Sequence, residues 1–196
     1  MRTAILTLES LSPYSQSKAI RSEKEKGELD KTFHERTWRE HLHVHRSGKV
    51  YIPPMAFKYA FATAARYASL KVDGKGNATY TKYFEAGVQV TEPLLLPFGP
   101  EDPQVACEWV YCHAQPTRPS QGGRVHRAYP TIQEWAGELS VLVVADEIPP
   151  SIFEQVVNYA GQIIGVGRFR PENGGYYGRF AVREIAWSNE NTLKGD

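Results

Sequence analysis

Residues 165–180 combine three kinds of side chain that together suit a nucleic acid. Arginines present planar donor forks that match phosphate, and aromatic rings offer faces on which bases stack. Glycines allow positive φ and let the backbone approach a partner closely. Glu172 is the only acid in the stretch. We therefore predict a loop that binds nucleic acid through Gly165, Gly167, Arg168, Phe169, Arg170, Gly174, Gly175, Tyr176, Tyr177 and Arg179.

The same stretch has a purely structural interpretation. Asn173, Gly174 and Gly175 are typical of a hairpin tip, and the neighbouring rings could be strand residues of the core, as we expect for Phe180. However, a plain hairpin turn does not need arginines on both sides of its tip. Their presence favours the binding interpretation.

A second basic segment lies at residues 114–130, where Arg118, Arg124 and Arg127 occur without any acid. Its Pro and Gly content predicts a protruding hairpin or a loop. The formal net charge of the 196 residues is only +1, so overall charge does not indicate a polyanionic partner. Any basic surface must be local, and residues 114–130 and 165–180 are its two sources.

Composition sets the broad class of the protein. A hydrophobic fraction of 41% over 196 residues predicts one globular domain with a substantial core. Cys107 and Cys112 have neither the number for a disulfide framework nor the spacing of a zinc knuckle. No apolar run approaches membrane-spanning length and no signal-peptide pattern is present, so we expect a cytoplasmic protein without a membrane partner. No motif indicates a cofactor.

The order of elements predicts an α+β fold. Residues 3–8 alternate as a strand, and residues 57–68 repeat small apolar side chains at helical spacing after Pro54. Residues 137–187 are typical of a β–α–β unit, with the glycine-rich loop before its last strand. We therefore expect a ferredoxin-like antiparallel sheet with helices on one face and irregular insertions.

Alternating histidines at positions 41, 43 and 45 would share one face if this segment were a strand. With His34 and Glu35 they raise the alternative of a metal-dependent nuclease. Alternate residues of a strand lie roughly 6.5–7 Å apart, so three of them seldom reach one ion. No cysteine or paired carboxylate completes a ligand set nearby. We therefore predict no metal site and expect a polar strand face.

The segment of residues 48–58 resembles the RAMP superfamily, the RNA-binding subunits of CRISPR effector complexes. Ile52, Pro53, Phe57 and Lys58 match that family's pattern of Ile-Pro, an apolar residue and Lys before a helix. The sequence departs from the pattern at Pro54, Met55 and Ala62, where the family has glycine, serine and arginine. The glycine-rich loop before the last strand and the order of elements also agree. Residues 73–135 carry no matching motif.

This resemblance implies one ferredoxin-like or RRM-like domain over residues 1–196, with insertions at residues 12–48 and 73–135. It implies binding of single-stranded RNA along a groove, beside other copies or related subunits, in antiviral defence. Residues 114–130 would form the protruding thumb-like hairpin, and Lys58 would join the arginines in contacting phosphate. We expect binding and no catalytic residue. A stand-alone binder of single-stranded DNA or RNA, virus-encoded or mimicking a CRISPR complex, is the alternative.

Overall fold

The computed structural model describes residues 1–113 and 123–189. Its centre is an antiparallel sheet of four strands in the order β4-β8-β1-β9. β1 (Arg2–Ser10) pairs with β8 (Ala136–Val143) on one side and β9 (Phe180–Asn189) on the other. β4 (Val88–Gln89) pairs with the other edge of β8. The chain runs β1–α2–β4–β8–α4–β9 through this unit, which is the connectivity of a ferredoxin-like fold. The predicted α+β class is confirmed.

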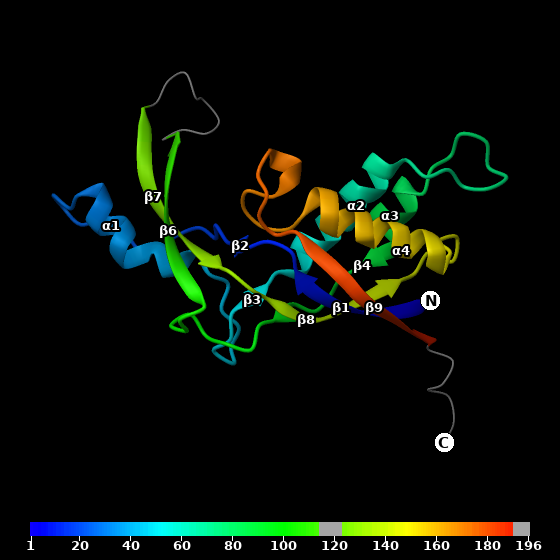
Figure 1. Cartoon of the computed structure of the whole chain (residues 1–196), viewed down its shortest axis with the longest axis horizontal. Helices are drawn as coiled ribbons and strands as arrows, with labels where there is room; N and C mark the ends of the chain where they lie inside the picture. Colours follow the sequence, from blue (N-terminus) through cyan, green and yellow to red (C-terminus); the bar gives the residue numbers. More distant parts are fainter. Residues whose placement is uncertain (114–122, 190–196) are drawn as a thin grey trace.

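Three helices cover one face of this sheet (Figure 1): α2 (Pro54–Ala68), α3 (Thr81–Gly87) and α4 (Pro150–Tyr159). Strand alternation explains why only one face is covered. Ala4, Leu6 and Leu8 of β1 are fully buried, whereas Ile5 between them is 38% exposed. α2 buries its predicted stripe from Phe57 to Ala65 against the sheet.

Aromatic side chains fill the space between helices and sheet. The ring of Phe57 packs against Trp135 and Phe180, and the ring of Phe153 packs against Phe84 and Trp187. Phe180 is therefore a core residue, as predicted. These contacts anchor β9, and with it the loop that precedes it, to the helical layer.

A two-stranded ribbon extends beyond the main sheet (Figure 1). It consists of β6 (Val105–His113) and β7 (Arg124–Ile132), and β2 (Tyr14–Ser15) pairs with the base of β7. The short β3 (Tyr51–Ile52) pairs with β5 (Leu94–Leu95). Residues 114–122, the tip of the predicted thumb-like hairpin, lie outside the described residues. The range 73–135, expected to be an insertion, holds this ribbon but also β4 of the main sheet.

The strand predicted around the three histidines is only partly present. His43 and His45 flank Val44, which forms an isolated antiparallel β-bridge with Val50, whereas His41 ends η1 (Trp38–His41). Before it, α1 (Asp30–Thr37) carries His34 and Glu35, and both helices pack against β7. Arg36 of α1 binds Glu28 through two nitrogens at 2.7 and 2.9 Å, and its guanidinium also reaches the carbonyl of Glu23.

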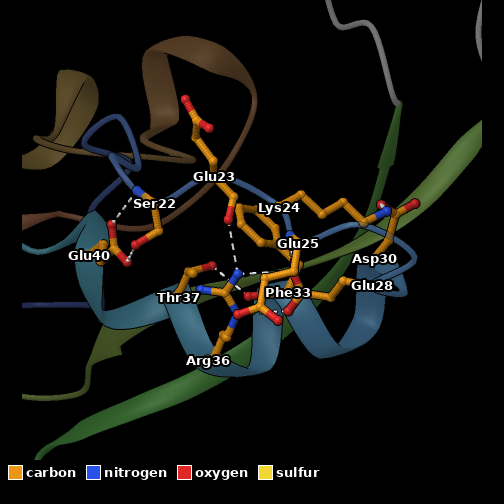
Figure 2. Close-up of polar contacts among 10 residues, drawn as sticks. All are labelled: Ser22, Glu23, Lys24, Glu25, Glu28, Asp30, Phe33, Arg36, Thr37 and Glu40. Carbon is orange, nitrogen blue, oxygen red and sulfur yellow. Dashed lines mark hydrogen bonds and ion pairs between the residues drawn. The ribbon is translucent and has the colours of Figure 1, made fainter.

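Figure 2 shows these contacts among residues 22–40, hereafter the charged clasp, which folds back along α1. Lys24 pairs with Asp30 at 2.7 Å, and Glu40 accepts hydrogen bonds from the hydroxyl and the amide of Ser22. Charged side chains close together in the sequence therefore pair with one another here.

Candidate nucleic-acid interface

The glycine–arginine loop, residues 165–179, begins where α4 ends. After α4 the chain makes one π-helical turn, η3 (Ala160–Ile164), and leaves it at Gly165 with φ +73°. Backbone hydrogen bonds then tie the loop across itself, from Val166 N–H to the Gly178 carbonyl and from Tyr177 N–H to the Phe169 carbonyl. A further bond joins the Arg168 N–H to the Ser15 carbonyl of β2 at 2.9 Å. The loop therefore has a defined conformation, which hydrogen bonds within it and to β2 hold in place.

Most glycines of this loop serve packing within the chain. A Cβ on Gly175 would lie 1.9 Å from the Phe169 carbonyl oxygen, and one on Gly178 would lie 1.8 Å from that of Val166. A Cβ on Gly167 would meet the Tyr14 ring at 2.4 Å. Gly174 differs, because it has φ +78° and open space around the missing Cβ. The close approach that the sequence assigned to a partner is therefore made by the protein itself at these packed positions.

Arg168 lies over two aromatic rings. Its guanidinium carbon is 3.3 Å from the ring centroid of Tyr129 and 4.0 Å from that of Phe169. Tyr129 in turn stacks on His41, with centroids 4.6 Å apart and planes at 26°. Burial lowers the pKa of Arg168, and its Nη1 is buried without a hydrogen-bond partner among the described residues. Interaction with ring faces helps to hold this cation in place of an ion pair.

The other two arginines of the loop are engaged differently. Arg170 donates from Nε to Glu172 at 2.8 Å and from Nη1 to the Gly167 carbonyl, and Glu172 also accepts the hydroxyl of Tyr59. Arg179 donates to the Gln162 carbonyl at 3.1 Å. The charge of Arg170 is therefore matched by a carboxylate, unlike that of Arg168.

The three predicted stacking rings also separate into two kinds. Phe169 and Tyr176 are 37% and 61% exposed, whereas Tyr177 is 7% exposed. The Tyr177 hydroxyl donates to Glu108 of β6 at 2.7 Å, and Thr131 of β7 donates to the same carboxylate. Burial, and then the hydrogen bond to Glu108, raise the pKa of Tyr177. Tyr177 thus joins the loop to the ribbon and does not offer its ring at the surface.

A groove brings the two predicted basic segments together. It has a volume of about 490 Å³, and we refer to it as the hairpin groove. Arg124 and Arg127 of β7 line it beside Arg168 and Phe169 of the loop. Aromatic surface is added by Tyr111, on which the Arg124 guanidinium lies 5.7 Å from the centroid, and by Tyr129. The third arginine of the segment, Arg118, lies outside the described residues.

A second groove of about 440 Å³ runs along the start of α2, and we refer to it as the helix groove. Lys18, His43, Met55 and Tyr59 line it together with Arg168 and Arg170. Ser17 and Arg168 belong to both grooves. The stacked guanidinium therefore lies where one groove meets the other.

Lys58 does not join this surface. Its ammonium donates to three carbonyl oxygens at the end of α3, those of Phe84 at 2.9 Å, Glu85 at 2.6 Å and Val88 at 2.5 Å. Burial lowers the pKa of Lys58. Because its donors are occupied by the backbone, Lys58 acts in the fold, in contrast to the phosphate contact that the sequence suggested.

Sequence reasoning missed Lys18 and Tyr129 as groove residues. A signal for Tyr129 was available, because Arg127 and Tyr129 are two residues apart on a predicted hairpin strand and so share a face. No local signal identified Lys18, which lines the helix groove and whose backbone bonds to His41.

The three histidines do not form one cluster. The rings of His43 and His45 both contact the ring of Tyr51, and His45 also bonds Ser47. His41 lies apart from them, on Tyr129, and bonds the Lys18 carbonyl through Nδ1. Within residues 1–113 and 123–189, no group of three or more His, Cys, Asp or Glu side chains could hold a metal ion. In the same part of the chain, no helix has the length and apolar character to cross a membrane.

Comparison with known proteins gives similarity in structure and none in sequence. No family model and no curated protein matches the chain. One similar solved structure is a chain of the type III-B Cmr-beta complex bound to cognate target RNA, with a TM-score of 0.51 and 12% identity over 95% of this chain and 60% of that one. Another is Cmr6 from Pyrococcus furiosus, with a TM-score of 0.50 and 12% identity over 93% of this chain and 99% of that one. The chain thus shares the fold of these two structures, and this fold agrees with the ferredoxin-like architecture that the sequence led us to expect.

Proposed function

We propose that the chain binds single-stranded nucleic acid, and RNA in particular, along the hairpin groove and the helix groove. The observation that supports this most is the meeting of two basic segments far apart in sequence. Arg124 and Arg127 of β7 and Arg168 of the loop line one groove, and Arg168 continues into the next. Aromatic surface lies beside the cations in both grooves. The two grooves, which meet at Arg168, therefore offer cations for phosphates and aromatic rings for bases along one path.

The binding mechanism divides between charge and stacking. Arg124, Arg127 and Arg168 contact phosphates, which supplies affinity and makes it depend on salt. Exposed aromatic rings beside these cations stack on bases, at about 1–3 kcal/mol per base. Arg170 lines the helix groove, whereas Gly174, Tyr176 and Arg179 line neither groove. Lys58 and Tyr177 act by holding α3 and the ribbon in place.

The similarity in fold favours RNA over DNA and assembly over solitary action. The Cmr-beta structure is a complex bound to target RNA, so we propose that this chain also works beside other copies or related subunits. The role we assign is binding, and no side chain is given a bond-breaking step.

The test is fluorescence anisotropy with single-stranded RNA and DNA of the same sequence over a series of salt concentrations. We compare the wild type with the double variant Arg124→Gln/Arg127→Gln. The slope of log affinity against log salt is negative, and each lost phosphate contact makes it less steep by about 0.7. The slope of the double variant should therefore be less steep than that of the wild type by about 1.4. The matched control is Lys71→Gln/Lys82→Gln, which removes two cations at the α2–α3 end of the molecule and should leave the slope unchanged.

Absence of binding to either polymer at low salt would overturn the proposal. Binding that the control variant weakens as much as the groove variant would show that the grooves are not the site. Equal affinity for RNA and DNA would favour a stand-alone binder of single strands over an RNA-bound subunit.

A further inference from the structure

Phe169 has a backbone conformation that is costly for an aromatic residue. Its φ is +54°, and among the residues that the structure describes only one other non-glycine residue, Ser69 at the end of α2, has a positive φ. A bulky side chain rarely adopts this left-handed region, so the surrounding structure must impose it. The Phe169 carbonyl accepts the Tyr177 N–H at 2.9 Å, and Gly175 passes it so closely that a Cβ would not fit.

This conformation holds the Phe169 ring at the surface. The residue is 37% exposed and lines the hairpin groove, while the ring of Tyr177 meets it edge-on with centroids 6.2 Å apart. A hydrophobic ring would gain more from burial than from this position. Backbone strain that places an apolar ring in an open, basic groove points to a ligand for that ring.

A series of flat groups lies against the Phe169 ring. The Arg168 guanidinium contacts the rings of Phe169 and Tyr129, and Tyr129 stacks on His41. Arg168 belongs to the glycine–arginine loop, Tyr129 to β7 and His41 to η1. Three separate elements thus support one outer ring, which makes its position rigid.

We infer that the exposed ring of Phe169 is the stacking site for one unpaired nucleobase, which adds a further flat layer to the series Phe169, Arg168, Tyr129 and His41. This inference rests on the proposed function and assigns one base of the bound strand to one side chain. Stacking on an aromatic side chain tolerates any base, because every base has a π-face. The phosphates on either side of that base lie within the basic groove that Arg124, Arg127 and Arg168 line.

The experiment uses oligoribonucleotides that carry the fluorescent base 2-aminopurine at one position, moved along the strand from one oligonucleotide to the next. Stacking quenches 2-aminopurine, so the wild type should quench it strongly at a defined position. Phe169→Leu should lose that quench and weaken binding about 5- to 150-fold, the range expected for one stacked base. Phe169→Trp should keep both the quench and the affinity. Tyr67→Leu is the matched control, because Tyr67 is 56% exposed on α2 and lines neither groove.

Removing the base from the oligonucleotide is a second test of the same site. An abasic residue at the quenched position should weaken wild-type binding to the level of Phe169→Leu and should not weaken the variant further. If the wild type binds with the expected salt slope but Phe169→Leu binds equally well, the stacking site is wrong while the proposed function stands. If no strand binds at low salt, both fail together. Leu at position 169 keeps the same backbone cost, so equal melting temperatures would show that lost binding is not lost folding.

Discussion

The charged clasp and the glycine–arginine loop are both rich in charged side chains, but they use them in opposite ways. In the clasp three cations have carboxylate partners: Lys24 pairs with Asp30 and Arg36 with Glu28 (Figure 2). Lys31 pairs with Glu35. In the loop the central cation, Arg168, lies over the rings of Tyr129 and Phe169.

The difference shows why charge density along a sequence does not locate a binding surface. Opposite charges a few ångströms apart cancel each other's field, so the clasp has little attraction for a distant polyanion. A guanidinium supported by rings keeps its net charge. Arg170 shows that the distinction applies within the loop as well, because its pairing with Glu172 resembles the clasp.

The largest expected effect tests how rigidly the loop is built. In Gly178→Ala the new Cβ would lie 1.8 Å from the Val166 carbonyl oxygen at φ +68°. Strain and steric overlap together should lower the free energy of unfolding by about 3–4 kcal/mol. Gly174→Ala, with similar φ but open space, should cost about 1 kcal/mol. Urea denaturation of both variants measures the two values, and similar losses would contradict the tight packing at Gly178.

The next effect concerns Lys58, which the resemblance of residues 48–58 to a family motif placed in the site and the structure places elsewhere. Lys58→Met removes the donor to three carbonyl oxygens at the end of α3, and should lower the free energy of unfolding by about 2 kcal/mol. Oligonucleotide affinity at fixed salt should not change. If Lys58→Met folds normally but its affinity depends less steeply on salt, Lys58 contacts a phosphate and belongs to the binding surface.

A smaller effect is expected where the loop meets the ribbon. Tyr177→Phe deletes the hydroxyl that donates to Glu108 and leaves that carboxylate with Thr131. The free energy of unfolding should fall by about 1 kcal/mol. Hydrogen exchange should also rise at the Tyr177 and Val166 amides, which bond within the loop. Unchanged exchange would mean that backbone bonds alone hold the loop.

The smallest effect at neutral pH belongs to the clasp. The Arg36 guanidinium lowers the pKa of Glu28 from 4.5 to about 2. Because the folded pKa lies below the ordinary one, this pair stabilises the fold above about pH 4.5, and the contribution disappears as the pH falls towards 2.

Arg36→Ala should therefore lower the melting temperature slightly at pH 7, where the pair is intact, and the two curves should converge as the pH falls from 5 towards 2. Nucleic-acid binding at neutral pH should not change. Melting temperature against pH for the wild type and the variant makes the comparison. Lys71→Ala, outside the clasp, serves as the control and should follow the wild-type curve.

Much of the fold could be predicted because it depends on local periodicity. The alternation of β1, the apolar stripe of α2 and the β–α–β unit at the end of the chain each appear within a single segment. The strand expected around the histidines is only partly present for the opposite reason. His43 and His45 flank the bridge between Val44 and Val50, but His41 belongs to η1. Its ring bonds the Lys18 carbonyl and stacks on Tyr129, and these contacts join residues far apart in the sequence.

The sequence by itself determined the fold class, the two basic segments and the buried Phe180. Each of these depends on residue type and spacing within one segment. Only the tertiary structure decided that Arg168 lies over Tyr129, that Arg124 and Arg127 share its groove, and that Lys58 and Tyr177 serve the fold. Those outcomes depend on which distant backbone and side chain come to lie beside each group. Strand pairing and helix packing bring them together, and no spacing along the chain records that arrangement.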